Sequence, residues 1–175
     1  KRFIFLGTIL EYGQGTGPFT EDTKSTGQMR NYEIGKAKVR EIGLAESKQR
    51  GTIYIHVRVS YTFGAPQRKN SLIDTLHTAC EKQDVAKLGA CENNRDYTHT
   101  SEVAEGVLRL CNLDASATVN LGSGGSLRLK EFVEKYWSEI GGDPELLGFA
   151  PPNNRPDEPN PFMDVSTLER LTNWK

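Results

Sequence analysis

The chain has 175 residues, a length that suits one ordinary domain or one part of a larger protein. Its 22 Lys and Arg against 23 Asp and Glu give a formal net charge of -1, which argues against a dedicated nucleic-acid binder because such a protein needs a net basic surface. The 17 Gly and 8 Pro show no period, which excludes a collagenous or low-complexity chain.

The sequence contains no signal for a membrane or for secretion. No apolar stretch approaches the roughly 20 residues that span a bilayer, and no charged start is followed by an apolar run and a cleavage site. We therefore expect a cytoplasmic protein without a membrane partner. The 3 Cys are scattered without a Cys-x-x-Cys motif, which predicts reduced thiols, and the 3 His lack paired ligand spacing, so we expect no metal site.

The first half of the chain predicts a strand, a helix and a strand. The continuous apolar run over residues 3–6 is typical of a strand buried on both faces. Over 31–47 apolar residues recur at helical spacing, with Asn31 as the expected cap. β-Branched and aromatic residues over 52–59 predict a second buried strand. This order implies a right-handed βαβ unit within a parallel sheet.

The second half predicts shorter elements. We expect helices over 71–80, over 101–111 with Ser101 as its cap, and over 166–171, a strand over 118–121, and a Pro- and Asn-rich surface connection over 151–161. Ser126 is expected to cap one further amphipathic helix. The apolar stripe of that helix comprises Leu129, Phe132, Val133, Tyr136, Trp137 and Ile140.

Three polar residues of the first half are candidates for chemistry. Tyr32 and Lys36 stand four apart on the predicted helix, so both project from one face. A phenol titrates near pH 10 and must drop by about 3 units to act as a base near neutrality, and an ammonium one turn away favours that drop. Thr8 ends the first strand at the edge where open α/β sheets bind ligands, where its hydroxyl either orients a substrate oxygen or satisfies a backbone group.

Six ordered motifs cover nearly the whole chain. They begin with Gly-Thr-Ile-Leu-Glu-Tyr-Gly and Asn-Tyr-Glu-Ile-Gly-Lys, and they occupy residues 7–13, 31–36, 57–66, 94–106, 119–124 and 155–174. In this series the sequence resembles the extended short-chain dehydrogenases/reductases, the NAD(P)-dependent epimerases, dehydratases and reductases of nucleotide sugars. The resemblance implies the later part of a doubly wound, Rossmann-type parallel sheet plus a small mixed α/β substrate-binding lobe. Residues 1–66 would belong to the sheet, and 67–175 mainly to the lobe, with some segments returning to the core sheet.

The resemblance also implies roles for the candidate residues. Thr8 matches the catalytic Ser/Thr that contacts the substrate, and Tyr32 matches the general acid/base. Lys36 matches the residue that lowers the phenol pKa and bonds the nicotinamide ribose, so Tyr32 and Lys36 would bind NAD or NADP. Arg95 and Arg155 match arginines that clamp the diphosphate of a nucleotide-diphosphate sugar, a role that suits the planar guanidinium, although each could instead be a solvated surface charge.

Departures from the family pattern narrow the reaction that the resemblance implies. The 4,6-dehydratases carry Asp-Glu where this chain has Ile9 and Leu10, and the fucose-synthase type needs a Cys at Leu10. Apolar side chains cannot transfer protons, which leaves C4 epimerisation or reduction of a 4-keto sugar. Tyr61 stands where relatives often carry an Asn against the sugar nucleotide. The glycine turn at 122–125 lacks the G-x-G-x-x-G spacing and favours a tight turn over a phosphate cradle.

The cofactor-binding start of the family is not represented in this sequence. The chain opens on a strand-like run without an initiating Met, so we expect a truncated piece that is inactive alone. Two alternatives stay open: half of an enzyme completed by a partner chain, or a non-catalytic fragment that binds a nucleotide sugar or a partner through its exposed sheet edge. Because many relatives pair through the helix that carries Tyr-x-x-x-Lys, the resemblance also implies a homodimer.

Overall fold

Three strands rich in β-branched and aromatic residues form the central sheet of the computed structural model, which describes residues 1–64, 67–152 and 160–174. The strands are β1 (Arg2–Leu6), β2 (Ile53–Val59) and β7 (Ala117–Leu121), in the order β1-β2-β7. Both pairs are parallel, and the register joins Ile4 to Ile55 and Val57 to Val119. The predicted parallel α/β sheet is therefore confirmed.

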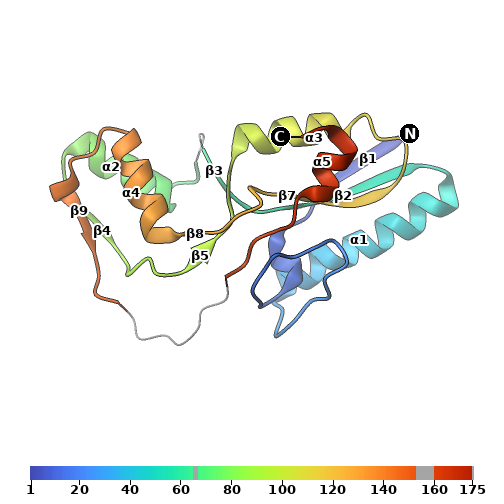
Figure 1. Ribbon diagram of the computed structural model, residues 1–175, viewed down its shortest axis with the longest axis horizontal. Coiled ribbons are helices and arrows are strands. Elements are labelled where there is room, and N and C mark those ends of the chain that lie inside the picture. Colours follow the sequence, from blue (N-terminus) through green and yellow to red (C-terminus); the bar gives the residue numbers. More distant parts are fainter. Residues whose placement is uncertain (65–66, 153–159, 175) are drawn as a thin grey trace.

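Helices cover both faces of this sheet (Figure 1). The long helix α1 (Asn31–Arg50) packs against β2 on one face, while α3 (Thr100–Leu110) and α5 (Ser166–Thr172) pack against each other and against β2 and β7 on the other. The core between the sheet and α3/α5 is apolar. Its fully or nearly fully buried members are Ile55, Val57, Val59, Leu110, Val119, Leu121 and Leu168.

The first strand lies at the edge of the sheet. Among the described strands β1 pairs only with β2, and Phe3 is 60% exposed and Leu6 44% exposed. The prediction that this strand is buried on both faces is therefore wrong in this structure, because an edge strand lacks the neighbours that would cover these side chains.

A smaller lobe lies beside the sheet (Figure 1). Its helices are α2 (Leu72–Lys82) and α4 (Leu129–Glu139), and its short strands pair as β4 (Ala86–Leu88) with β9 (Leu147–Phe149), and β5 (Asn94–Arg95) with β8 (Leu127–Arg128). The strands β3 (Tyr61–Phe63) and β6 (Tyr97–His99) pair in parallel, and the 3-10 helices η1 (Ile9–Tyr12) and η2 (Pro144–Leu146) complete the elements.

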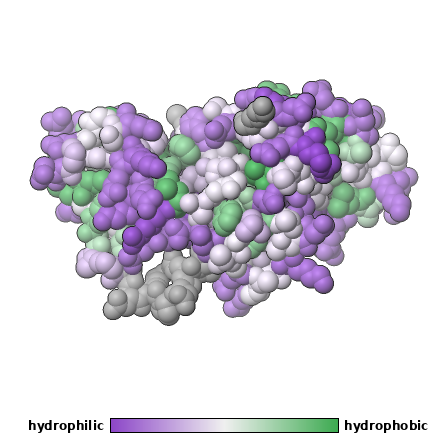
Figure 2. Space-filling view, in the orientation of Figure 1, coloured by the Kyte–Doolittle hydropathy of each residue, from purple (hydrophilic) through white to green (hydrophobic). Residues whose placement is uncertain are grey.

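The predicted apolar stripe of α4 forms the centre of the lobe. Phe132, Val133 and Trp137 are buried, and they pack with Ile73 and Leu76 of α2. On the face shown in Figure 2, polar residues dominate and hydrophobic ones form separate small groups, over the lobe as well as over the sheet. Of the predicted 151–161 connection, residues 153–159 lie outside the described residues. None of the described helices combines the length and apolarity needed to cross a membrane.

The helices occur where the periodicity predicts them, but three of their caps differ. Arg30 precedes α1 in place of Asn31, and the Glu33 carboxylate accepts the Arg30 backbone N–H at 2.6 Å. His99 caps α3 in place of Ser101. Ser126 caps nothing, because the residues after it pair as β8 before α4 begins. Glu33 and Glu102 complete the caps of α1 and α3 at a three-residue spacing that the sequence contains, whereas the start of α4 depends on strand pairing, which local patterns do not reveal.

Candidate active site

Thr8 lies directly after β1, at the carboxyl edge of the sheet. It caps η1: its Oγ1 accepts the backbone N–H of Leu10 at 3.3 Å, and its own backbone N–H donates to Glu11 Oε1 at 2.9 Å. A hydroxyl has one donor and two acceptor lone pairs. The cap uses one lone pair, so the O–H donor of Thr8 can serve a substrate oxygen, and no acceptor takes it within the described residues.

The first turns of α1 bring Tyr32 and Lys36 to the same edge. The Lys36 ammonium donates to the Leu6 carbonyl at 2.7 Å and lies 4.7 Å from the centroid of the Phe5 ring. It also lies 5.7 Å from the centroid of the Tyr32 ring, and Tyr32 itself is 57% exposed. The four-residue spacing therefore places both side chains beside the end of β1, and the bond to Leu6 anchors the ammonium there.

One open cavity of about 400 Å³ contains all three candidates, Thr8, Tyr32 and Lys36. Its other walls come from the ends of β1 and β2 and from the start of α3. They comprise Leu6, Gly7, Val59, Ser60, Thr62, Thr100 and Val103. This is the location where open α/β sheets bind their ligands.

A neighbouring cavity of about 310 Å³ contains Tyr61 and Arg95, together with Ile9 and Leu10. Its remaining wall comprises Gly13, Gln14, Gly15 and Pro161. The Arg95 guanidinium carbon lies 5.0 Å from the centroid of the Tyr61 ring. Burial raises the pKa of Tyr61 although the Arg95 charge opposes this.

Consecutive residues divide between the two cavities: Thr8 and Ser60 line the first, and Ile9 and Tyr61 line the second. Tyr61 and Arg95 therefore do not line the cavity of Thr8, Tyr32 and Lys36. The sixth predicted residue, Arg155, lies outside the described residues.

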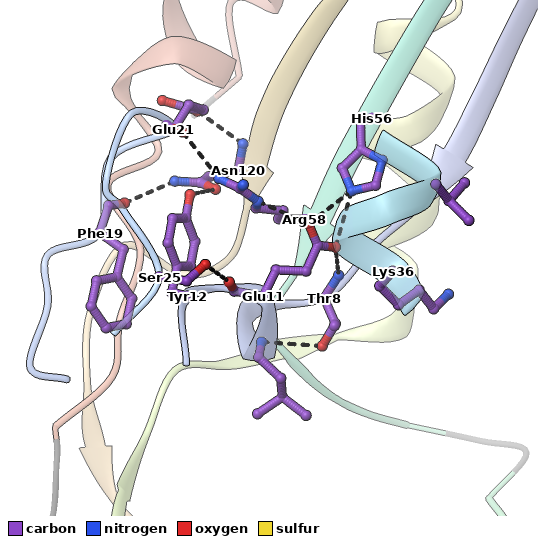
Figure 3. Close-up of polar contacts among 12 residues, drawn as sticks. Thr8, Glu11, Tyr12, Phe19, Glu21, Ser25, Lys36, His56, Arg58 and Asn120 are labelled. Atoms are coloured by element: carbon purple, nitrogen blue, oxygen red, sulfur yellow. Dashed lines mark hydrogen bonds and ion pairs between the residues drawn. The ribbon is translucent and has the colours of Figure 1, made fainter. Parts of the chain in front are cut away.

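Behind Thr8 lies a buried polar cluster that the sequence interpretation missed (Figure 3). The Glu11 carboxylate is fully buried and contacts His56 Nε2 at 3.0 and 3.1 Å and Arg58 Nε at 3.2 Å. Burial alone would raise the pKa of Glu11, but the hydrogen bond and charge of His56, the Thr8 N–H and the Arg58 charge outweigh it and lower the pKa. One signal was available: His56 and Arg58 are polar residues two apart in a strand, so they share a face.

A second buried group ties the loop after η1 to β7. The Tyr12 hydroxyl donates to Asn120 Oδ1 at 2.6 Å, and Asn120 Nδ2 donates to the Phe19 carbonyl at 2.8 Å (Figure 3). Arg58 links the two groups, since its guanidinium carbon lies 4.3 Å from the centroid of the Tyr12 ring and its Nη1 donates to the Glu21 carbonyl at 3.1 Å. One continuous network of polar contacts thus links the residues that lie behind the walls of both cavities.

The glycine segment at 122–125 bends the chain after β7. The backbone N–H of Ser123 donates to Asp96 Oδ1 at 2.8 Å. Asp96 is fully buried, and burial raises the pKa of its carboxyl although hydrogen bonds from Ser123 and Met163 oppose this. Because a carboxylate already occupies the turn, it offers no cradle for a phosphate.

The fold and these cavities define an α/β protein of the Rossmann type with its candidate site at the carboxyl ends of parallel strands. The sequence model of the NAD-dependent epimerase/dehydratase family matches residues 1–122. The chain belongs to this family of nucleotide-sugar epimerases and dehydratases.

Individual relatives agree with this assignment. UDP-glucuronic acid decarboxylase 1 of Xenopus tropicalis is 22% identical over 147 residues, which are 82% of this chain and 34% of that protein. UDP-N-acetylglucosamine 4-epimerase from Bacillus cereus superposes with a TM-score of 0.84 at 20% identity, covering 98% of this chain and 57% of its own. dTDP-glucose 4,6-dehydratase from Bacillus anthracis, in complex with NAD, superposes with a TM-score of 0.82 at 20% identity, covering 99% of this chain and 56% of its own. The chain therefore spans about a third of the curated relative and somewhat more than half of these solved structures.

Proposed function

We propose that this chain carries the catalytic and substrate-binding residues of a NAD- or NADP-dependent enzyme that acts at C4 of a nucleotide-diphosphate sugar, as an epimerase or a 4-keto-sugar reductase. The observation that supports it most directly is the single cavity that joins Thr8, Tyr32 and Lys36 at the end of β1. Family membership supports the substrate and cofactor classes, and the whole protein's activity is part of the proposal.

In this mechanism Tyr32 exchanges a proton with the C4 oxygen, and the free O–H donor of Thr8 orients that oxygen. The bond to Leu6 keeps the positive charge of Lys36 at the strand end, 5.7 Å from the centroid of the Tyr32 ring. Bound NAD or NADP supplies or accepts the hydride at C4.

The described residues fit the nicotinamide-ribose end of such a cofactor. An ammonium has three donors, and Leu6 uses one of those of Lys36, so two can bind ribose hydroxyls. Leu6, Val59 and Val103 give the cavity an apolar wall for a flat ring. The glycine-containing loop between β1 and α1 lacks the G-x-G-x-x-G spacing of a pyrophosphate site, and Asp96 occupies the turn at 122–125, so this fit covers one end of the cofactor only.

The surroundings of Ile9 and Leu10 support the choice of reaction. Both line a cavity as alkyl side chains, and they occupy the two positions where the 4,6-dehydratases carry the Asp-Glu pair that eliminates water. Alkyl side chains cannot transfer protons, which disfavours dehydration as the reaction. Arg95 is proposed to bind the diphosphate, with Tyr61 as the substrate contact beside it and Arg155 as a second clamp.

A homodimer through α1 is the proposed assembly. Ile34, Val39 and Ile42 of this helix are exposed, and an apolar cavity of about 280 Å³ lies between its second half, Phe3 and Tyr54. Ile42→Asp should shift the intact protein to monomers in analytical ultracentrifugation, because it places a charge in an apolar contact. An unchanged sedimentation coefficient would contradict this assembly. The exposed edge of β1 supports the second candidate, a fragment that binds a partner chain there without catalysis.

The experiment that tests the function is turnover by the intact protein with NAD(H) or NADP(H) and a set of UDP- and dTDP-sugars and their 4-keto forms. Tyr32→Phe should lower kcat about 100-fold or more, since the proton transfer is lost while the ring remains. Turnover that survives Tyr32→Phe unchanged would refute the assigned role. Binding of a nucleotide sugar without any binding of cofactor would instead favour the non-catalytic candidate.

A further inference from the structure

A carboxylate is buried directly behind the hydroxyl that the proposed reaction uses. Glu11 accepts the Thr8 backbone N–H at 2.9 Å and is itself fully buried, as is His56 beside it (Figure 3). A helix cap does not need this burial: at the start of α3 the exposed Glu102 accepts the His99 N–H in the same way, at 3.0 Å. Since burying a carboxylate is costly unless it is well paired, its position here calls for a reason beyond capping.

The carboxylate is held by the central strand of the sheet. His56 and Arg58, two residues apart on β2, both contact it, at 3.0 and 3.2 Å. A side chain at Gly7 would collide with the Glu11 carboxylate and with the His56 ring, so position 7 must be glycine for the end of β1 to approach so closely. Thr8 is therefore bonded to a group whose own position the sheet determines.

The same network continues to the helix that carries Tyr32 and Lys36. The second ring nitrogen of His56, Nδ1, lies 3.1 Å from the Tyr54 hydroxyl, which lies 3.3 Å from the Val39 carbonyl of α1. Tyr54 also packs tightly under the helix, where a side chain at Gly43 would collide with its ring. Hydrogen bonds thus run without interruption from Thr8 to α1, through Glu11, His56 and Tyr54.

We propose that Glu11 and His56 are positioning residues that set where the Thr8 hydroxyl lies relative to Tyr32. The inference rests on the proposed function, because it concerns the geometry of that reaction. Thr8 and Tyr32 come from different segments, so their relative position depends on what lies between β1 and α1. A displacement of about 1 Å can cost about 100-fold in rate, and a buried network on a rigid strand limits such a displacement.

Glu11→Gln is the variant that tests this most directly. Thr8 donates to Oε1 and Arg58 donates to Oε2, whereas an amide accepts at its oxygen only and must turn its NH2 group toward one of these donors. We expect kcat of the intact protein to fall about 10- to 100-fold with KM changed less than about threefold, since Arg95, the proposed diphosphate contact, lines the other cavity. Glu102→Gln is the matched control, because it removes the same charge from an exposed cap.

A double-mutant cycle separates positioning from a general effect on the fold. If Glu11 acts through the Thr8 hydroxyl, Glu11→Gln should lower kcat in the wild-type protein but add almost nothing in a Thr8→Val background. If the kcat losses of Glu11→Gln and Thr8→Val simply multiply in the double variant, the inference is overturned. A Thr8→Val variant with unchanged turnover would refute the proposed function instead, so the two failures are distinguishable.

Hydrogen exchange at the Thr8 amide provides a measurement independent of turnover. The bond to a buried carboxylate should protect this amide in the intact protein, and His56→Phe, which removes one partner of Glu11, should make it exchange faster. Protection that is absent, or that His56→Phe leaves unchanged, would overturn the inference even for a protein that turns over no sugar tested. Faster exchange together with the non-multiplicative cycle would support it.

Discussion

Replacing Asn120 should be among the more damaging single changes in the sheet region. Its amide accepts the Tyr12 O–H at 2.6 Å and donates to the carbonyls of Phe19 at 2.8 Å and Asp164 at 3.2 Å. In Asn120→Ala the Phe19 carbonyl keeps the Asp164 N–H at 2.9 Å, so it retains a partner. The buried Tyr12 O–H loses its acceptor, although Arg58 still contacts the hydroxyl, and the Asp164 carbonyl loses the amide donor, which should lower the free energy of unfolding by about 2–4 kcal/mol.

Urea denaturation of the intact protein measures this loss. Asn112→Ala is the matched control, because Asn112 is exposed and its change should stay within about 0.5 kcal/mol. Adding Tyr12→Phe to Asn120→Ala removes the hydroxyl that has lost its acceptor and should restore about 1 kcal/mol. A double variant no more stable than Asn120→Ala alone would refute the reasoning, since the loss would then come from the cavity and not from the hydroxyl.

Three further predictions concern the candidate site. Lys36→Met should lower kcat about 100-fold or more, while Lys38→Met, on the same helix but paired with the exposed Glu41, should leave kcat unchanged. Steady-state kinetics that respond equally to both variants would contradict the role assigned to Lys36. Arg95→Ala should raise KM about 10- to 100-fold by removing charge-assisted bonds to the diphosphate, and an unchanged KM would exclude that contact. Because folding lowers the pKa of Glu11, the contribution of this carboxylate to stability is complete above the unfolded value of 4.5 and is lost as the pH falls from there through the folded pKa. The melting temperature of Glu11→Gln should therefore depend less on acid pH than that of the wild type. Parallel curves of melting temperature against pH would count against this.

Much of the fold follows from periodicity in the sequence. The runs over 3–6, 52–59 and 118–121 become the three strands of the sheet, and the predicted helices begin and end within a few residues of their observed bounds. The strands β4, β5, β8 and β9 could not be predicted, because elements of two or three residues are too short to show alternation. The edge position of β1 likewise depends on which strands pair, which an apolar run does not reveal.

The candidate site also contains one part that local sequence patterns predict and one part that they do not. A strand end and a four-residue helical spacing suffice to bring Thr8, Tyr32 and Lys36 into one cavity. Glu11 was missed because it lies in a short 3-10 helix without any periodic pattern, and its burial depends on His56 and Arg58, more than forty residues further along the chain. Side-chain networks of this kind arise from tertiary contacts, so single-sequence patterns carry little trace of them.

The long excursion between β2 and β7 has a consequence for how the chain folds. The register pairs Val57 with Val119, so α2, β4, β5 and α3 all lie between the second strand of the sheet and the third. Closing so large a loop is entropically costly, whereas the helix α1 forms from local contacts. We expect β7 to join the sheet late, after β1, α1 and β2 have come together. Substitutions in β7 should then change the rate of unfolding more than the rate of folding.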